Sequence, residues 1–354
     1  MKVLIVAGGT AGHIIPALVV AEELQQKDKD LDILFVTTRK KQDWELILKK
    51  GFSLKKIFAG KFRKYFSLLN LVDIFKVVAG FFQSLFIILR FKPQIIFSKG
   101  GYISVPVVLA SRILGKRIII HESDFVLGLA NRISFPFADK LAVSFPVEFY
   151  KNKKDKLFFS GNPVRNLATR EKSYNESKTI FIIGGSQGAR KINFAVSEIL
   201  DEFLKDYKII HLVGELDFED VKKKKELLDK EKSKNYLIYP NVFDDKDYGE
   251  LLGRADVVIS RGGAGVISEL ATLGKASIII PLRGHQEKNA EILEKNNAAL
   301  VLRNEDLTSL ELKNKIKTLL QDNELMNRLK NNISKFSSKN AASIISKEIL
   351  SLGK

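Results

Sequence analysis

The sequence predicts an α/β protein of two Rossmann-like, doubly wound parallel-sheet domains that face each other across a cleft. Short apolar runs rich in β-branched residues alternate with segments of helical spacing along the chain, as in parallel α/β sheets. A strand, a Gly-Gly turn and a helix follow one another at Lys2 and again at Thr179, so the pattern starts twice. A length of 354 residues suits two domains of ordinary size. We expect domains at 1–162 and 163–337, with a final helix at about 338–354 packing back on the first.

The composition is that of a folded, soluble-type protein, and we expect the protein to stay in the cytoplasm. Apolar residues make up 45% of the chain and charged residues 28%, which excludes a disordered chain. There is no cysteine, so neither a disulfide framework nor a thiolate metal site is available. The short apolar run at the N-terminus leads directly into a glycine turn, and we interpret it as a first strand and not as a signal peptide.

The positive charge is concentrated in the first half of the chain. The net charge is +17. Residues 1–160 contain 26 Lys and Arg against 13 Asp and Glu, so they carry +13 of it, and residues 161–354 carry only +4. A basic half indicates a polyanionic partner, either nucleic acid or the anionic face of a membrane. Charge alone does not separate these two classes.

The first glycine turn is a candidate ligand site. Lys2–Ala7 is the first strand, Gly8–His13 is the turn, and a helix is expected from about Ile14 to Gln26. Ligands of doubly wound sheets bind at the carboxyl ends of the strands, which is where His13 is expected. The alternative is a buried histidine with a purely structural role. The next strand does not end in a clear acidic residue for an adenosine ribose, which argues against a dinucleotide cofactor.

Further strands of the first domain also end in glycine or polar residues. Lys99–Pro106 is a glycine turn that follows a strand at Ile95–Ser98, and His121–Asp124 follows a strand at Arg117–Ile120. The remaining elements are expected as a strand at Leu31–Thr37, a helix near Asp43–Lys50 and strands at Lys140–Ser144 and Leu157–Phe159.

Gly60–Gln94 has the composition of a membrane-surface segment. Its longest uncharged stretch, Val77–Leu89, is 13 residues, whereas a membrane span needs roughly 20. The segment holds six basic residues against one acid, and many phenylalanines and leucines, as segments that lie in a membrane interface do. About half of the apolar residues are expected to pack on the sheet instead. The residues predicted to face the membrane are Lys61, Arg63, Lys64, Phe66, Phe75, Phe81 and Phe82.

The second domain repeats the pattern. Thr179–Ile183 is its first strand and leads into the turn Gly184–Arg190. Lys222–Lys234 is expected to be one charged, solvated helix, and Leu307–Leu352 a helical tail. Its other strands are expected at Ile209–Val213, Leu237–Tyr239, Asp256–Ser260 and Ser277–Pro281.

Asp256–Gly274 is the most informative stretch of the second domain. A strand at Asp256–Ser260, the glycine-rich turn Arg261–Gly265 and a helix at Val266–Leu273 follow one another. Glycines let a ligand approach the backbone, and the first N–H groups of a helix bind anions. Glu269, one turn into the helix, is suited to accept hydrogen bonds from a sugar diol. Phosphate and diol together indicate a nucleotide, although tight glycine turns also occur in α/β proteins without such a ligand.

The sequence lacks the motifs that are typical of nucleic-acid and metal binding. The chain has no helix-turn-helix, zinc-ligand spacing, Walker A loop or RNA-stacking motif, so nucleic acid is not expected as a partner. No Asp-x-Asp metal motif stands convincingly after a strand. We therefore expect neither a metal nor any other cofactor.

Eight motifs stand in order along both expected domains: Gly8–His13, Lys61–Phe66, Phe97–Pro106, His121–Asp124 with Gly128–Arg132, Gly161–Arg165, Gly184–Arg190, Arg261–Glu269 and His285–Ala290. Together they resemble the bacterial peptidoglycan N-acetylglucosaminyltransferases, B-type glycosyltransferases that convert lipid I to lipid II. The resemblance covers both expected domains in the right order.

The resemblance implies that the second domain binds UDP-N-acetylglucosamine. The implied contacts are Ser186 at a phosphate, the backbone near Phe243 at uracil, Ala264, Gly265, Val266, Ile267 and Ser268 at the diphosphate and sugar, Glu269 at the ribose diol and Gln286 at the sugar hydroxyls. From the first domain, Thr10, Ala11, Gly12 and His13 would close on the donor sugar, with Arg165 contributing near the linker.

The implied acceptor is an undecaprenyl-pyrophosphoryl N-acetylmuramyl pentapeptide at the cytoplasmic face of the bacterial cell membrane. Its C4 hydroxyl would attack the anomeric carbon, invert it to a β-1,4 link and expel UDP. His13 is the candidate general base at neutral pH, with Glu122 and Asp124 as reserves. Asp124 is also a candidate for sugar binding.

Ala11 departs from the family, which usually has glycine there; this matters if the position needs a positive φ. Two alternative functions remain at this point. One keeps the fold with another lipid acceptor, as in a glycolipid synthase or natural-product sugar transferase, and the other is a nucleotide-binding membrane adaptor without catalysis.

Overall fold

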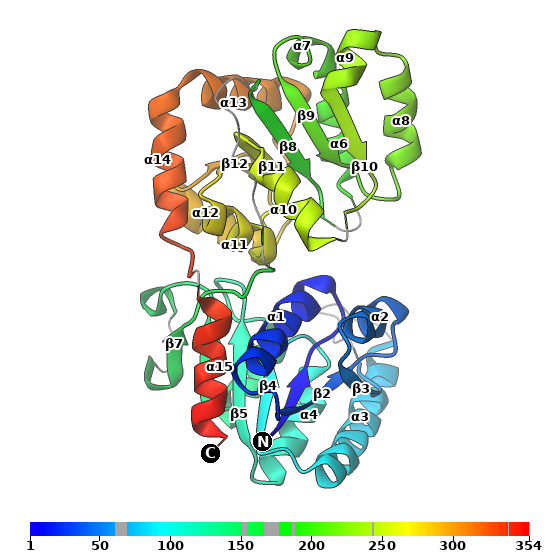
Figure 1. Ribbon diagram of the computed structural model, residues 1–354, viewed down its shortest axis with the longest axis vertical. Coiled ribbons are helices and arrows are strands. Elements are labelled where there is room, and N and C mark those ends of the chain that lie inside the picture. Colours follow the sequence, from blue (N-terminus) through cyan, green and yellow to red (C-terminus); the bar gives the residue numbers. More distant parts are fainter. Residues whose placement is uncertain are drawn as a thin grey trace. The chain divides into compact units, whose positions relative to one another are not determined.

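The computed structural model describes residues 1–60, 69–150, 154–165, 167, 177–185, 188–242, 244–338 and 340–353. The chain divides into two compact units (Figure 1). Unit 1 comprises Met1–Arg165 and Ser338–Lys354, and unit 2 comprises Asn166–Ser337. Each unit contains one parallel sheet covered by helices, which confirms the predicted pair of doubly wound α/β domains.

Unit 1 is built on a seven-stranded parallel sheet in the order β3-β2-β1-β4-β5-β6-β7. The chain moves outward from β1 in one direction through β2 and β3, and then returns to place β4 on the other side of β1. The carboxyl ends of β1 and β4 therefore form the switch point at which such sheets bind ligands. The strands are β1 Lys2–Val6, β2 Asp32–Thr37, β3 Ser53–Lys56, β4 Ile95–Ser98, β5 Arg117–Glu122, β6 Lys140–Val143 and β7 Leu157–Phe159.

The helices of unit 1 cover this sheet, and β1 and β4 are buried almost completely. Continuous apolar strands of this kind are expected where both faces of a parallel sheet are covered. The helices are α1 Ala11–Lys27, α2 Lys41–Lys49, α3 Leu69–Phe91, α4 Ser104–Ile113, α5 Leu129–Ser134 and α15 Ala341–Leu352.

The last helix, α15, belongs to unit 1. Ile345 and Ile349 of α15 are buried in the same core as Val3 and Ile5 of β1. Lys140 also bonds to Glu348 of α15. The end of the chain is thus part of the core of the first unit, although it follows the whole of the second in sequence.

Unit 2 is built on a six-stranded parallel sheet in the order β10-β9-β8-β11-β12-β13. Its switch point lies between β8 and β11, and the two glycine turns predicted to bind the nucleotide follow these two strands. The strands are β8 Thr179–Ile183, β9 Lys208–Leu212, β10 Tyr236–Tyr239, β11 Val257–Ser260, β12 Ala276–Ile279 and β13 Leu300–Val301.

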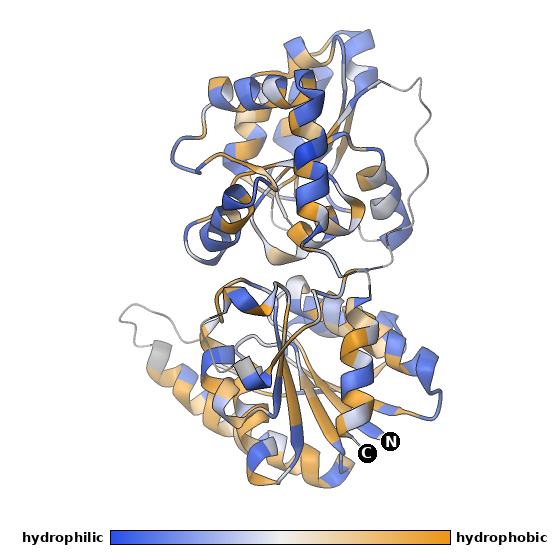
Figure 2. Cartoon of the chain, turned by 90° about the vertical axis from the view of Figure 1, so that its left-hand side faces the viewer, coloured by the Kyte–Doolittle hydropathy of each residue, from blue (hydrophilic) through white to orange (hydrophobic). Residues whose placement is uncertain are grey.

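The helices of unit 2 bury one apolar core with these strands. In Figure 2 the strands are mainly hydrophobic and the helices show both hydrophobic and hydrophilic residues, as expected for amphipathic helices on a buried sheet. The helices are α6 Arg190–Ser197, α7 Leu200–Phe203, α8 Phe218–Glu226, α9 Lys230–Asn235, α10 Asp245–Gly253, α11 Ala264–Leu273, α12 His285–Lys295, α13 Ser309–Gln321 and α14 Asn323–Ser334.

Several details differ from the sequence prediction. The charged segment Lys222–Lys234 is not one helix but parts of α8 and α9, because Asp229 starts a new helix by accepting the N–H of Lys232. The short strands β3 and β13 were not predicted, since four and two residues give little periodicity. Helix α1 begins at Ala11, three residues earlier than expected, so His13 lies in its first turn.

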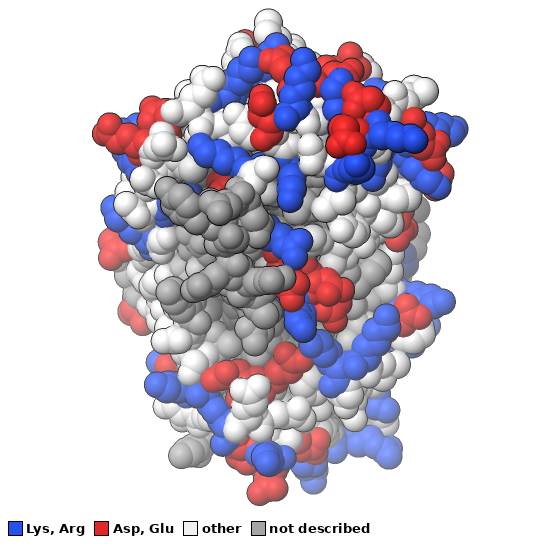
Figure 3. Space-filling model, turned by 45° about the horizontal axis from the view of Figure 1, so that its top comes forward, with Lys and Arg blue, Asp and Glu red and all other residues white. Residues whose placement is uncertain are grey.

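The charged surface of α8 and α9 is compensated locally. Lys232 pairs with Asp201 at 2.8 Å, and Lys234 with Glu231 at 2.7 Å. Figure 3 shows Lys and Arg interspersed with Asp and Glu on the face toward the viewer. Exposed pairs of this kind contribute little to stability, and the segment is a solvated face as predicted.

Helix α3 exposes an apolar stripe and buries a face of small and polar residues. Gly80, Ser84, Ile88 and Asp73 are buried. A Cβ on Gly80 would lie 2.1 Å from the carbonyl oxygen of Phe58, so glycine allows this close approach. Val72 and Ile74 are exposed. Six further exposed apolar residues repeat every three or four positions: Leu71, Phe75, Val78, Phe82, Phe86 and Leu89. We call these six residues the α3 stripe.

The length of α3 corrects one expectation. By length and composition alone, Leu71–Phe91 is long and apolar enough to cross a membrane, which the 13-residue uncharged run had excluded. Lys76 and Asp73 pair at 3.1 Å and do not interrupt the helix. Of the predicted membrane residues, Phe75 and Phe82 are exposed and Phe81 is half-buried. Lys61, Arg63, Lys64 and Phe66 lie outside the described residues.

Candidate functional site

The first glycine turn of unit 1 is held by an aspartate that the sequence analysis did not identify. Asp43 is buried in α2, and its Oδ2 accepts the Gly9 N–H at 2.6 Å and the Thr38 hydroxyl at 2.5 Å. Gly9 has a φ of 94°, and a Cβ there would lie 2.8 Å from the ring of Tyr102. Only glycine fits this position, and Asp43 fixes its N–H.

The other residues of this turn begin α1. Thr10 is the N-cap, and Ala11, Gly12 and His13 form the first turn of the helix. Within the described part of the chain, Lys92 and Asn297 are the non-glycine residues with positive φ. Ala11 therefore has a negative φ, which alanine adopts without strain. The alanine that replaces the usual glycine of the family at this position does not strain the backbone.

His13 is neutral at physiological pH. Burial, and then the charge of Lys99, lower the pKa of His13 to about 4. Its Nδ1 lies 3.0 Å from the hydroxyl of Thr10. In the tautomer that carries its proton on Nδ1, Thr10 accepts this hydrogen bond and Nε2 keeps a lone pair. A neutral imidazole with such a nitrogen has the form required of a general base.

Lys99 is a buried cation at the carboxyl end of β4. Its side chain is 1% exposed, and its Nζ donates to the hydroxyl of Ser123. Burial lowers the pKa of Lys99 to about 8, and the charges of Glu122 and Asp124 oppose this shift. A buried ionisable group with a shifted pKa beside a glycine turn is typical of a functional site. The sequence signal is a lysine directly after a strand of three apolar residues and a serine, Ile95–Ser98.

Glu122 is occupied by the loop that follows it. Its Oε1 accepts the Asp124 N–H at 3.0 Å, and its Oε2 accepts the Gly128 N–H at 2.8 Å and the Asn131 amide at 2.9 Å. Burial, and then Asp124, raise the pKa of Glu122 above its ordinary value, while these hydrogen bonds oppose the rise. A carboxylate with three such bonds is suited to shaping this loop.

Unit 1 thus brings together most of its predicted site residues. A Cβ on Gly101 would lie 3.5 Å from the ring of His13, so the turn after β4 is adjacent to the turn after β1. Asp124 is half-buried, and its carbonyl oxygen accepts the hydroxyl of Tyr150 at 3.2 Å. Arg165 is half-buried at the end of this stretch of unit 1.

The turn after β11 in unit 2 presents helix N–H groups. Gly263 is the N-cap of α11, and the Ile267 N–H already bonds to the Gly263 carbonyl at 3.1 Å. The amides that α11 leaves for a ligand are therefore those of Ala264, Gly265 and Val266. Ile267 is 1% exposed, and the Ser268 hydroxyl donates to the Ala264 carbonyl at 2.7 Å. Their predicted contacts with the donor stay a prediction.

Arg261, the first residue of this turn, anchors it through its side chain. Its Nη1 donates to Asn304 at 2.8 Å and to the carbonyl of Ile280 at 3.2 Å. The Asn289 amide donates to the Gly262 carbonyl at 3.1 Å, and a Cβ on Gly262 would lie 2.8 Å from the carbonyl oxygen of Gln286. The turn after β11 and the start of α12 are thus packed against each other.

Gln286 and Glu269 lie on the two neighbouring helices. Gln286 is half-buried, and its Oε1 accepts the Leu282 N–H at 3.0 Å. Glu269 is 7% exposed, and its Oε2 accepts the hydroxyl of Tyr248 at 2.7 Å. Ser186 and Phe243 lie outside the described residues.

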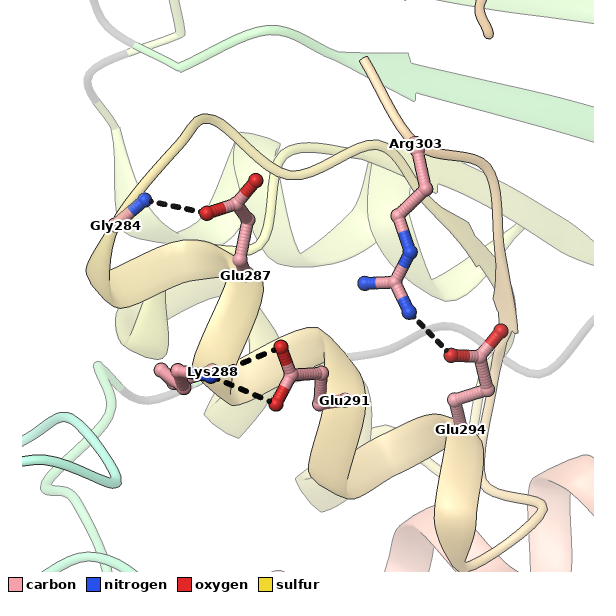
Figure 4. Close-up of polar contacts among 6 residues, drawn as sticks. All are labelled: Gly284, Glu287, Lys288, Glu291, Glu294 and Arg303. Carbon is pink, nitrogen blue, oxygen red and sulfur yellow. Dashed lines mark hydrogen bonds and ion pairs between the residues drawn. The ribbon is translucent and has the colours of Figure 1, made fainter. Parts of the chain in front are cut away.

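The start of α12 is fixed by its own polar contacts (Figure 4). The Glu287 carboxylate accepts the Gly284 N–H at 2.8 Å and closes the first turn. Lys288 pairs with Glu291 at 3.1 Å, and Arg303 with Glu294 at 2.6 Å. These contacts fix the helix that carries Gln286.

A pocket of about 400 Å³ lies at the carboxyl end of β10. Its lining contains three carboxylates, which does not suit a diphosphate. Across the described residues, no group of three His, Asp or Glu side chains could hold a metal ion. The pocket is lined by Tyr239, Asn241, Val242, Asp244, Asp247, Glu250, Leu251 and Arg254.

Solved structures share this fold. The crystal structure of Acinetobacter baumannii MurG superposes with a TM-score of 0.77 at 24% identity and covers 99% of this chain and 100% of that one. The UDP-GlcNAc 2-epimerase from Neisseria meningitidis bound to UDP-GlcNAc has a TM-score of 0.70 at 14% identity, with 99% and 100% covered. At these identities the likeness concerns the fold.

Sequence comparison identifies the family. The N-terminal domain model of glycosyltransferase family 28 matches residues 3–143, and its C-terminal domain model matches residues 179–347. A Thermoanaerobacter sp. (strain X514) protein is 35% identical over 99% of this chain and 100% of its own length. A Clostridium kluyveri protein is 36% identical over 93% and 94%. Both are named UDP-N-acetylglucosamine–N-acetylmuramyl-(pentapeptide) pyrophosphoryl-undecaprenol N-acetylglucosamine transferase. This chain therefore belongs to glycosyltransferase family 28.

Proposed function

We propose that the protein transfers N-acetylglucosamine from UDP-N-acetylglucosamine to the C4 hydroxyl of an undecaprenyl-pyrophosphoryl N-acetylmuramyl pentapeptide, with inversion at the anomeric carbon. The full-length identity of about 35% to transferases of this name carries the proposal. Conversion of lipid I to lipid II in peptidoglycan synthesis is the corresponding role.

The donor binds in unit 2. The amides of Ala264, Gly265 and Val266, with the helix dipole behind them, meet the diphosphate. Glu269 accepts the ribose hydroxyls, and Gln286 bonds to the sugar. Ser186 and the backbone near Phe243 complete the phosphate and uracil contacts, as the family resemblance implies.

The acceptor reacts beside unit 1, with His13 as the general base. Nε2 of His13 takes the proton of the C4 hydroxyl while the new C–O bond forms and the bond to UDP breaks. An anionic substrate beside Lys99 offsets the positive charge there and raises the pKa of His13 from about 4 toward its ordinary value. Glu122, occupied by its three hydrogen bonds, positions the loop that carries Asp124.

UDP leaves as an anion without a metal. Fixed N–H groups at a helix N-terminus stabilise the developing negative charge of the leaving group. The chemistry therefore needs no cofactor, and excess EDTA is expected to leave the rate unchanged.

The protein binds the cytoplasmic face of the membrane through α3. The α3 stripe exposes large apolar side chains, such as Phe75 at 68% and Phe86 at 64%, and contiguous exposed apolar residues mark interaction sites. The opposite face of the helix is buried and contains Gly80 and Ser84. The stripe enters the interface while that face stays on the protein, and the net positive charge supports attraction to anionic lipids.

The decisive experiment measures UDP release from UDP-N-acetylglucosamine with lipid I, with diacylglycerol and with no acceptor. UDP release is expected only in the mixture that contains lipid I, and EDTA should not change it. Release with diacylglycerol in place of lipid I would assign a glycolipid synthase. Donor binding without release in any mixture would instead indicate a nucleotide-binding adaptor.

A further inference from the structure

Tyr248 and Glu269 form a buried hydrogen-bonded pair between two helices of unit 2. Tyr248 lies in α10 and is 2% exposed, and Glu269 lies in α11 and is 7% exposed. The Tyr248 hydroxyl donates to Glu269 Oε2 at 2.7 Å. The short distance and the burial of both side chains make this a well-formed contact.

The phenol of Tyr248 is itself held in place. Its ring packs edge to face on Phe181 of β8, with centroids 6.3 Å apart and planes at 80°. Phe181 is buried two residues before the end of the strand that leads to the Gly184 turn. Tyr248 therefore links the carboxylate of α11 to the rigid centre of the sheet.

We propose that Tyr248 is a positioning residue for the donor nucleotide. By holding Oε2 of Glu269 it sets the rotamer of the carboxylate that is proposed to accept the ribose hydroxyls. This inference rests on the proposed function, since it needs Glu269 at the ribose. If Tyr248 positions Glu269, it also contributes to the preference of the protein for a ribonucleotide over a 2′-deoxyribonucleotide.

Unit 2 provides a matched control. Tyr236 is 0% exposed, and its hydroxyl lies 2.9 Å from Nδ1 of the buried His211. Tyr236→Phe removes one buried tyrosine hydroxyl, as Tyr248→Phe does, but at a hydrogen bond that does not involve Glu269. A difference between the two variants separates positioning of Glu269 from a general loss of packing.

The test measures the binding of UDP and of 2′-deoxy-UDP to the full-length protein by calorimetry. The wild type is expected to prefer UDP by roughly 10-fold or more, because the deoxy ligand loses a hydrogen bond to a charged group. In Tyr248→Phe, UDP binding weakens about 5-fold and the preference falls to within about 3-fold. Tyr248→Met, which fills the space with a flexible apolar side chain, is expected to behave alike, so the test does not depend on one variant folding.

Glu269→Gln distinguishes the possible failures. If it abolishes the preference while both Tyr248 variants keep the wild-type value, the role of Tyr248 is overturned. If Glu269→Gln keeps the preference, or the wild type has none, the proposed ribose contact itself is wrong. Tyr236→Phe is expected to retain the wild-type preference for UDP. If the preference fell in Tyr236→Phe as much as in Tyr248→Phe, a general loss of packing would explain both results and the role of Tyr248 would be overturned.

Discussion

His13 combines the properties required of a base with a position on a fixed turn. Asp43 holds Gly9, Thr10 caps the helix, and the hydroxyl of Thr10 meets Nδ1 of His13. The sequence indicated the histidine through its place after a glycine turn. It did not indicate Asp43, because Gly9 and Asp43 are 34 positions apart in the sequence. They meet only when α2 packs against α1 and β2.

Replacement of His13 should affect transfer and spare donor binding. We expect His13→Ala and His13→Gln to lower kcat roughly 10²–10⁴-fold, since neither side chain can take the acceptor proton. The UDP affinity of the same variants should stay at the wild-type value, because the residues proposed to contact UDP itself are in unit 2. Steady-state kinetics and calorimetry check the two parts. Activity within a few-fold of the wild type in both variants would exclude His13 as the base.

Lys99 should cost stability at neutral pH. Its folded pKa of about 8 lies below the unfolded value of 10.5, so the unfolded chain binds the proton more tightly. The penalty is complete below pH 8 and disappears as the pH rises to about 10.5. Lys99→Met should therefore raise the free energy of unfolding by roughly 1–3 kcal/mol at pH 7.

Urea denaturation of the wild type and Lys99→Met at pH 7 and at pH 10 checks this prediction. The difference between the two proteins should shrink at the higher pH. A variant less stable than the wild type at pH 7 would show that the Ser123 contact outweighs the cost of burial. Lower transfer activity of the more stable variant would support a functional role for the buried cation.

At the scale of single elements, α3 differs most from the sequence expectation. Counting apolar residues in Gly60–Gln94 predicted correctly that they exceed one buried stripe. It did not predict which face is buried, because Gly80 and Ser84 look like weak points of an apolar helix. Tertiary packing decides that this face is buried, because Gly80 has no Cβ and so allows α3 to approach the Phe58 carbonyl closely.

Removal of the α3 stripe should release the protein from membranes. Phe75→Ser, Phe82→Ser and Phe86→Ser combined should weaken binding to anionic vesicles by roughly 100-fold or more, at about 1 kcal/mol or more lost per side chain. Leu216→Ser with Leu227→Ser is the control, because both leucines are more than 80% exposed in unit 2. Vesicle co-sedimentation measures both, and equal binding of all three proteins would contradict the docking role.

The same vesicles test the electrostatic part of membrane binding. Added salt should weaken binding, as should neutral replacements of Lys61, Arg63 and Lys64, because screening and charge removal both reduce attraction to anionic lipids. Binding that does not respond to salt would leave the apolar stripe as the sole contact.

On the scale of the whole molecule, three histidines with lowered pKa values make the fold sensitive to acid; His121 and His211 are buried and His13 is half-buried. Burial lowers the pKa of His13 to about 4 and of His211 to about 3, and holds the pKa of His121 well below its ordinary value. The unfolded chain therefore binds more protons than the folded protein below about pH 6.5. Stability is complete above that pH and is lost as the pH falls toward 4.

The expected slope is about 1.4 kcal/mol per pH unit for each histidine in this window. Glu122, whose pKa is raised by burial, opposes the loss in part. Urea unfolding curves between pH 7 and pH 4.5 check the slope for the protein. Stability that does not change across this range would mean that these histidines titrate alike in the folded and unfolded states.

The sequence by itself determined the two parallel sheets, their glycine turns and the family. Strand runs, turns and helical spacing are local patterns, and they repeat along the chain with enough regularity to be counted. The same patterns located His13 and Gln286 near the starts of helices, where the structure has them, and Glu269 within the helix that follows β11. These features depend on residues close together in the chain.

Only the tertiary structure decided which side chains meet. The Tyr248 hydroxyl reaches Glu269, Asp43 reaches Gly9, and α15 completes the core of unit 1 from the far end of the chain. Lys99 is costly because the packing around it excludes water, which composition does not show. Contacts between residues distant in sequence depend on how helices pack on a sheet, and that packing is a property of the folded chain as a whole.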